Sequence, residues 1–176
     1  MRSRPISITM LACCALSGFW TSVQGQVRMR EVSMAAGFSQ FDASGTGTAP
    51  VAALRVAAPL VSPWLLGDLN FVYASLDEQF STTNTRIGVA EGQLQGQWPS
   101  TRIRPYLGFG GGWLHYFNNA ASRPSTGPTL SAAAGLRVAA ARMIYRGELR
   151  LRTWESAGGG YNNSAAEFTA GVGWSF

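Results

Sequence analysis

Apolar side chains recur at every second position along most of the chain, and this period constrains the fold more than any other feature. In the ending E-F-T-A-G-V-G-W-S-F, one face carries Phe168, Ala170, Val172, Trp174 and Phe176, and small or polar residues lie between them. A period of two is that of a β-strand, whose successive side chains point to opposite faces. Helical periodicity is missing from the chain. The sequence therefore predicts an all-β protein.

Eight segments show this alternation, and turn-rich connections separate them. We predict strands at about 29–41, 51–58, 64–76, 85–97, 102–117, 129–139, 144–154 and 165–176. The connections are alternately long and short along the chain. Short turns at one end and longer loops at the other are typical of bacterial outer-membrane barrels. We therefore predict an eight-stranded antiparallel up-and-down transmembrane β-barrel.

The first 25 residues are predicted to be a cleaved signal peptide, which leaves residues 26–176 as the barrel. Two arginines precede a mostly apolar stretch, and small polar residues follow it. Val23 and Gly25 fit the small-residue rule for cleavage after Gly25. A membrane anchor is an alternative, but the apolar run is short for a span of ~20 residues. A lipoprotein acylated at Cys13 is another, although this cysteine precedes the end of the apolar region.

Composition narrows the class of protein further. Both cysteines lie in the predicted signal peptide, so the remaining chain has no disulfide and no cysteine metal site. Charged residues make up 13% of the chain, against ~25% in a typical soluble domain. The 14 basic residues are all arginines scattered among acids, which does not resemble a nucleic-acid-binding patch. So little charge in a secreted chain indicates that much of the protein surface contacts lipid.

The face opposite the apolar series carries charge in several predicted strands. Arg146, Arg150 and Arg152 alternate with Leu149 and Leu151 in one strand. An arginine on the lipid side at mid-bilayer costs ~2–4 kcal/mol, so we expect these side chains to point inward. An eight-stranded barrel has just enough interior space for its side chains. The predicted interior ionic cluster comprises Arg55, Asp68, Glu91, Arg137, Arg146, Glu148, Arg150, Arg152 and Glu167.

This cluster is expected to be a set of ion pairs, because an unpaired buried charge costs several kcal/mol. Across the last hairpin, Arg152 should lie near Glu167, and Glu148 could meet Arg137 or Arg150. We favour a structural role for the cluster over a transport path. Space for the long side chains is expected from the inward-facing glycines of P-Y-L-G-F-G-G-G-W, which are Gly108, Gly110 and Gly112.

The fourth predicted strand, R-I-G-V-A-E-G-Q-L-Q-G-Q, does not follow the pattern of the others. If Glu91 and the two glutamines that follow it face inward, Ile87 and Val89 must face inward as well. Glycines and Ala90 would then face lipid. A β-bulge near Ala90 would resolve this conflict. The orientation of this strand stays open at the level of sequence.

Most aromatic residues lie near the predicted strand ends, among them Trp64, Trp98, Trp113, Trp154 and Trp174. Aromatic rings favour the membrane–water interface. A soluble lipocalin-like barrel would instead bury its apolar face inside. The aromatic positions, the signal peptide and the charged opposite face together favour the membrane barrel.

The chain resembles the small bacterial outer-membrane barrels of the OmpA/OmpX type. The resemblance rests on the signal peptide, the eight alternating segments, the stretch R-P-Y-L-G-F-G-G-G and the ending F-T-A-G-V-G-W-S-F. It implies an outer-membrane location and contacts with membrane lipid and lipopolysaccharide. It also implies that the barrel-assembly machinery reads the last strand. The implied assembly signal consists of Phe168, Ala170, Val172, Trp174 and Phe176.

Chemical motifs are scarce in the sequence. The single histidine, His115, has Phe117 rather than serine two positions later, so the His-x-Ser pattern of barrel deacylases is missing. We predict no catalytic residue, metal or cofactor, and a monomer. The interpretation we favour is a non-enzymatic outer-membrane barrel with a structural or surface-interaction role. A narrow channel and a lipid A-modifying enzyme are the alternatives. Arg86 and Arg123, near the outer rim, could contact lipopolysaccharide phosphates.

Overall fold

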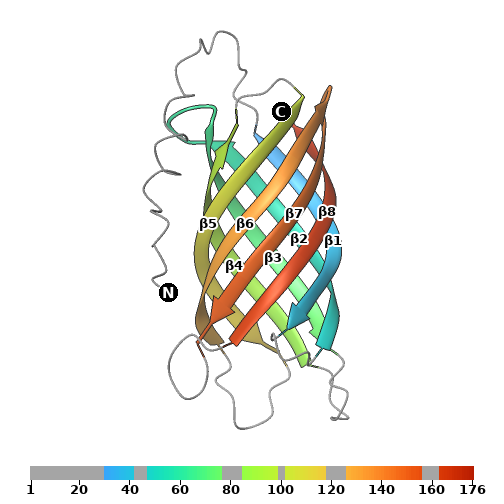
Figure 1. The fold of residues 1–176 in the computed structure, drawn as a ribbon, viewed down its shortest axis with the longest axis vertical. Helices are drawn as coiled ribbons and strands as arrows, with labels where there is room; N and C mark the ends of the chain where they lie inside the picture. The colour runs from blue at the N-terminus through green and yellow to red at the C-terminus, as the bar shows by residue number, and fades with distance from the viewer. Residues whose placement is uncertain (1–29, 42–46, 77–84, 99–101, 118–125, 156–162) are drawn as a thin grey trace, which may run out of the picture.

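The computed structural model describes residues 30–41, 47–76, 85–98, 102–117, 126–155 and 163–176. Eight strands make up almost all of these residues. They are β1 (Glu31–Phe41), β2 (Gly47–Pro59), β3 (Leu65–Leu76), β4 (Thr85–Gln97), β5 (Ile103–Tyr116), β6 (Thr126–Ala140), β7 (Met143–Trp154) and β8 (Asn163–Ser175). Each strand pairs with the next, and β8 pairs with β1, so that the sheet closes on itself (Figure 1). The predicted eight-stranded antiparallel barrel is confirmed. The predicted signal peptide lies outside the described residues.

The largest differences from the predicted starts are at β2 and β6, which begin at Gly47 and Thr126, and in each the predicted start followed a proline. Proline has no N–H to donate to a sheet and usually marks a strand end. The structure nevertheless keeps Pro50 inside β2, opposite Phe38, and Pro128 inside β6, opposite Trp113. The link between β1 and β2 is consequently as short as that between β2 and β3. The strict alternation of long and short connections is thus wrong at this position.

The fourth strand contains no bulge. The pairing of β4 with β3 runs without interruption from Leu65–Gly96 to Leu76–Thr85, and its pairing with β5 is equally continuous. Ile87 and Val89 therefore lie on the same buried face as Glu91. The mixed polarity of this strand has another origin, because the interior it faces changes from polar to apolar along the barrel.

The outer wall is apolar and the inner face is buried, as an alternating strand in a membrane barrel requires. Leu107, Phe109, Leu149 and Phe168 are among the outward side chains, and each is about half exposed or more. No helix in the described part of the chain is long and apolar enough to cross a membrane. The wall of the barrel itself is the surface that fits a hydrocarbon medium.

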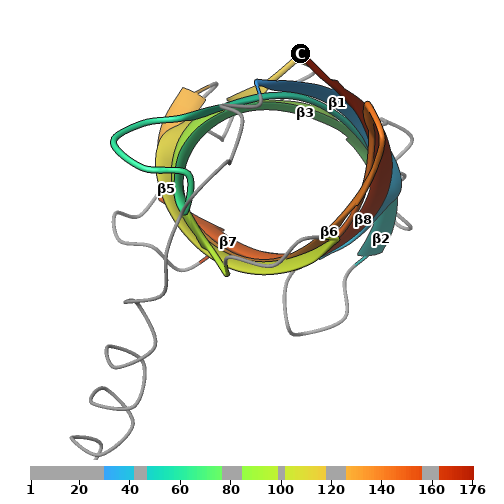
Figure 2. The ribbon, with the colours of Figure 1, turned by 90° about the horizontal axis from the view of Figure 1, so that it is seen from above.

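The two ends of the barrel differ. The links from β2 to β3, β4 to β5 and β6 to β7 lie at one end, together with the C-terminus (Figure 1). We call this the short-turn end and the opposite one the long-loop end. Viewed along the axis from the short-turn end, the strands form a ring around a central interior (Figure 2). The side chains that fill this ring form the candidate site.

Candidate functional site in the barrel interior

Ten buried charged side chains occupy the interior, and their formal charges cancel. Five are arginines and five are acids, and none is more than 4% exposed. They are Glu31, Arg55, Asp68, Glu91, Arg137, Arg146, Glu148, Arg150, Arg152 and Glu167. We call this set the lumen cluster. Because a buried charge is costly unless it is paired, the pairing pattern determines whether the cluster holds the barrel together.

Glu148 is the centre of the lumen cluster. Its Oε1 atom lies 3.0 Å from Arg55 Nη2 and 2.9 Å from Arg150 Nη2. Its Oε2 atom lies 2.8 Å from Arg146 Nη2 and accepts a hydrogen bond of 2.6 Å from the Tyr106 hydroxyl. Strands β2, β5 and β7 therefore meet at one carboxylate. Both oxygens are used twice, which is the condition for a buried carboxylate to stay ionised at low cost.

Toward the short-turn end, the pairing continues through Asp68 and Glu31. Asp68 Oδ2 lies 2.8 Å from Arg146 Nη1 and 3.7 Å from Arg137 Nη2. Glu31 Oε2 lies 3.3 Å from Arg137 Nε. The guanidinium carbons of Arg137 and Arg146 each lie 4.8 Å from the centroid of the Tyr106 ring. Both cations are therefore within the range of a cation–π interaction with the same aromatic ring.

Toward the long-loop end, the pairing continues through Glu91 and Glu167. Glu91 Oε1 lies 2.8 Å from Arg150 Nη1, and its Oε2 lies 3.2 Å from Arg152 Nη2. Arg152 also pairs with Glu167, and Ser131 donates a hydrogen bond to Glu91. The lumen cluster is thus one connected network across the interior rather than a set of separate pairs.

All nine residues of the sequence-predicted cluster face the interior. Arg152 lies against Glu167, and Glu148 meets Arg150 and not Arg137, which instead contacts Gln95 and Glu31. Sequence reasoning missed Glu31 and Tyr106. Strand parity could have found both, because Glu31 alternates with the outward Val32 and Tyr106 shares the face of Gly108.

The inward glycines of β5 make room for polar side chains of β4. A Cβ atom on Gly108 would lie 2.8 Å from the Gln93 side chain, and one on Gly110 would lie 2.8 Å from Glu91 Oε1. The covering side chains therefore come from the neighbouring strand. Gly135 of β6 has the same role for Tyr106, because a Cβ there would overlap the phenol ring.

We expect Gly135→Ala to lower the free energy of unfolding by about 1–3 kcal/mol, the usual range for overpacking an interior. The added methyl group would displace Tyr106 from Glu148 and would also meet the carbonyl oxygen of Gly147. Urea titration of the protein folded in lipid vesicles measures the change. Gly147→Ala is the matched control, because its Cβ would meet nothing within 4 Å. Equal stability of the two variants would contradict the packing role of Gly135.

An apolar layer fills the interior toward the long-loop end. It comprises Phe41, Ala49, Val51, Ala53, Val72, Ala74, Ile87, Val89, Leu114, Trp154 and Ala165, and we call it the apolar plug. The rings of Phe41 and Trp154 meet edge to face at 6.1 Å. Where this layer meets Arg152 and Glu167, the cavity measures only about 10 Å³, which is at the limit for one water molecule. The ionic cluster was predicted from the sequence, whereas an apolar plug beside it was not.

His115 lies on the outer surface near the long-loop end, where it contacts a hydroxyl group. Its Nδ1 atom is 2.8 Å from Thr126 Oγ1, and its ring packs edge-on against Phe117. The described part of the chain places no carboxylate in contact with His115. The pair has two elements of a nucleophile and base arrangement and lacks the third group that orients the imidazole.

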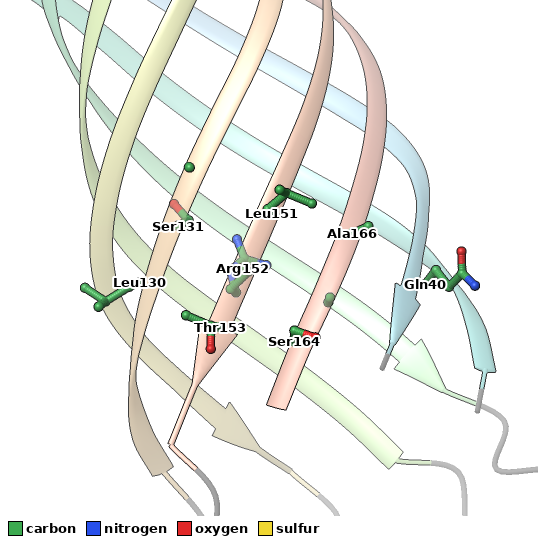
Figure 3. A pocket seen from close by; sticks show the side chains of 10 residues that line it. Gln40, Leu130, Ser131, Leu151, Arg152, Thr153, Ser164 and Ala166 are labelled. Atoms are coloured by element: carbon green, nitrogen blue, oxygen red, sulfur yellow. The ribbon is translucent and has the colours of Figure 1, made fainter. Parts of the chain in front are cut away.

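A groove marks the outer wall near the same end (Figure 3). Its volume is about 640 Å³, and it is lined by residues of β1, β6, β7 and β8. Leu130 and Leu151 form its apolar sides, while Thr153 and Ser164 lie closer to the rim (Figure 3), and Gln40 also lines the groove. The lining is largely apolar, so hydrocarbon is the medium that this part of the wall fits.

The residues of the predicted assembly signal lie on the outer face, from the middle of β8 to the residue that follows it. Phe168, Val172, Trp174 and Phe176 are each between 43% and 66% exposed, and Ala170 shares their face. The rings of Phe168 and Phe38 lie 5.7 Å apart on this surface. Recognition of this strand by an assembly machinery stays a prediction. No group of three potential metal ligands lies together among the described residues.

These features define the class of protein. A closed eight-stranded antiparallel barrel with an apolar wall and a filled, partly charged interior has the fold of the small bacterial outer-membrane β-barrels. The recognition made from the sequence is confirmed at the level of fold. No family model matches the chain, and no curated protein matches it.

Particular solved structures share this fold. Neisserial surface protein A is similar with a TM-score of 0.71 and 13% identity, over 84% of this chain and 97% of that chain. The outer-membrane enzyme PagL gives a TM-score of 0.61 and 15% identity, over 82% and 98%. A major outer membrane protein from Thermus thermophilus gives 0.50 and 14%, over 86% and 100%. At these identities, the likenesses show that the chain shares the fold of these outer-membrane proteins.

Proposed function

We propose that the protein is a non-enzymatic outer-membrane β-barrel with a structural or surface-interaction role and a sealed interior. The main observation behind the proposal is that two layers of buried side chains fill the lumen. The charge-balanced lumen cluster occupies the part toward the short-turn end, and the apolar plug occupies the part toward the long-loop end. A water-filled path would have to break ion pairs in the first layer and displace aromatic rings in the second.

The same filling argues against the narrow-channel alternative. Ions cross a pore when its charged groups are free to exchange partners with them. In this interior the Glu148 carboxylate already has four partners, and the side chains of Arg55 and Arg150 are no more than 2% exposed. The lumen cluster is therefore proposed to stabilise the barrel rather than to conduct.

Planar bilayer recording tests the sealed interior. We expect the purified protein to add no steady conductance to a bilayer in which an established porin gives clear steps. Discrete steps would contradict the proposal and favour the channel. Their origin can be checked with Phe41→Ala, which removes one ring of the apolar plug. A step size that changes in this variant would place the current inside the barrel.

The proposed location assigns the long-loop end to the cell exterior and the short-turn end to the periplasm. Membrane lipid and lipopolysaccharide then surround a monomeric barrel, and the assembly machinery acts on β8 during insertion. An epitope tag inserted within 156–162 should be accessible to antibody on intact cells. The same tag in the 141–142 turn should become accessible only after the outer membrane is permeabilised. The opposite result would reverse the orientation.

A second candidate function is a lipid acyl hydrolase, favoured by the contact of His115 with Thr126 at 2.8 Å. In such a reaction the Thr126 oxygen would attack an ester carbonyl while His115 takes its proton. The departing alkoxide would regain that proton, and water would later release the acyl group. The pair is on the outer wall near the long-loop end, where outer-leaflet lipid would lie. The lack of an orienting acid makes this the weaker candidate.

Mass spectrometry of lipid A separates the two candidates. Under the first proposal, cells with and without the protein should give the same lipid A masses. Loss of an acyl chain that disappears in both His115→Ala and Thr126→Ala would establish the hydrolase instead. Thr48→Ala is the control, because this threonine is also exposed and has no histidine opposite it. A loss that persists in both site variants would point to another enzyme in the cell.

A further inference from the structure

The short-turn end carries a set of arginines that the lumen cluster does not use. They are Arg30, Arg102 and Arg142, which are exposed at this rim; Arg104 on β5 is half-buried and is not part of this set. The lumen cluster is neutral by itself, so it does not compensate these charges. We call the three exposed residues the cationic arc.

The cationic arc is continuous along one side of the rim and is held by the barrel backbone. The carbonyl oxygen of Arg102 accepts a hydrogen bond of 2.9 Å from Ala139 N, at the end of β6. The carbonyl oxygen of Arg142 accepts one of 2.8 Å from Ser175 N, at the end of β8. Arg30 and Phe176 exchange two backbone hydrogen bonds of 3.0 Å. The three arginines therefore follow the neighbouring strands β5, β6, β7, β8 and β1.

Few acids oppose this charge. Among the described residues toward the short-turn end, the acidic groups are Glu31, Asp68 and the terminal carboxylate of Phe176. Asp68 is buried and pairs with Arg146. Glu31 is buried and pairs with Arg137. The rest of this rim, around the link from β2 to β3, is apolar, with Leu60, Val61 and Trp64 exposed. The rim is thus divided into a cationic side and an apolar side.

Aromatic side chains set the depth of the cationic arc in the membrane. Trp98, Trp174 and Phe176 are each more than half exposed at the same end of the barrel. Exposed tryptophans at the edge of an apolar wall lie at the level of the lipid headgroups. Arginines at this rim are then at phosphate level, and a guanidinium can donate two parallel hydrogen bonds to one phosphate.

We propose that the cationic arc binds the phosphate groups of anionic phospholipids in the leaflet on the short-turn side. The inference rests on the proposed membrane location. Its physical basis is a set of exposed arginines whose backbone positions are fixed at headgroup depth, with no described acid among them except the chain terminus. An acidic periplasmic macromolecule is the competing occupant, and the experiment below separates it from lipid because it uses no other macromolecule.

Spin-labelled lipids test the proposal in a pure system. The protein is folded into zwitterionic phosphatidylcholine vesicles that contain a trace of spin-labelled phosphatidylglycerol or spin-labelled phosphatidylcholine. Electron paramagnetic resonance gives the association constant of each lipid for the barrel surface. One basic residue near an anionic membrane surface typically changes affinity about fivefold. We expect a phosphatidylglycerol preference of at least that size at low salt, and its loss at high salt.

Arginine-to-glutamine variants test whether the cationic arc causes the phosphatidylglycerol preference. The triple variant R30Q/R102Q/R142Q should bring the preference close to one, and Arg142→Gln alone should lower it. The matched control is Arg86→Gln, which removes an exposed arginine at the long-loop end and should keep the preference. Arg104 is left unchanged because it is half-buried. These exposed positions usually change stability by less than about 0.5 kcal/mol, so the variants should fold.

The outcomes distinguish the inference from the function on which it rests. A wild-type barrel that inserts but shows no preference would overturn the inference alone and favour a macromolecular partner for the arc. A triple variant that keeps the full preference would overturn it as well. A wild-type protein whose unboiled and boiled samples migrate alike on gels would not be a membrane-inserted barrel, and the proposed function would fail first.

Discussion

Replacing Glu148 with glutamine is expected to lower the free energy of unfolding in lipid by about 3–5 kcal/mol, the usual cost of breaking a buried ion pair by removing one partner. Glutamine keeps the shape of the side chain but removes its charge. Arg55, Arg146 and Arg150 would then share a neutral amide at the centre of the lumen cluster. The three guanidinium groups would then repel one another without their common anion, which destabilises the folded barrel.

Urea unfolding in lipid vesicles, followed by tryptophan fluorescence, measures this loss. Glu155→Gln is the control, because Glu155 is exposed at the long-loop end and should change stability by less than about 0.5 kcal/mol. The double variant Glu148→Gln/Arg55→Gln removes one cation together with the acid. It should recover part of the lost stability if charge imbalance is the cause. A double variant less stable than the single one would favour packing over electrostatics as the cause.

The substitution Leu149→Arg is expected to cost about 2–4 kcal/mol, because it places a charge on the lipid-facing wall near the bilayer midplane. Leu149 lies in the middle of β7, opposite Phe168 and Ala134, and is 52% exposed. In a detergent or lipid medium this exposed fraction contacts hydrocarbon. The cost arises from the medium around the barrel and not from any contact inside it.

The matched control for this variant is Ile103→Arg at the first residue of β5. Ile103 is 54% exposed, but it lies at the rim, where an arginine reaches the headgroups and should cost only about 0–1 kcal/mol. The same urea titration compares the two. A soluble barrel would tolerate both substitutions equally. Equal costs for the two positions would therefore contradict the membrane location of the wall.

Much of the architecture could be predicted from the sequence because it depends on local period. The number of strands follows from alternation and their antiparallel order from the turn-rich connections, while the faces of Leu149 and Arg150 also required the cost of placing an arginine in lipid. The starts of β2 and β6 could not be predicted, because pairing with the neighbouring strands kept Pro50 and Pro128 inside the sheet. At these two positions, strand pairing in the closed barrel outweighed the local tendency of proline to end a strand.

In the candidate site as well, local alternation predicted some features and the tertiary structure decided others. Strand parity assigned all nine predicted charged residues to the interior, and could also have assigned Glu31 and Tyr106. It could not say which residues meet. Arg55 and Glu148 come from strands β2 and β7, which are not neighbours in the sheet, and they touch only across the lumen. Glu91 forms ion pairs with both Arg150 and Arg152 because the three side chains enter the lumen at similar heights along the barrel axis.

For every strand except the fourth, the sequence by itself determined that one face is suited to lipid and the other to an enclosed interior, because side chains alternate with a fixed period in any β-strand. Only the tertiary structure decided how that interior is divided. Ile87 and Glu91 lie on the same face of one strand, yet the first belongs to the apolar plug and the second to the lumen cluster. The tilt and stagger of the closed strands set the height at which each side chain enters the lumen. That height depends on all eight strands together, so it cannot be predicted from any single segment of the sequence.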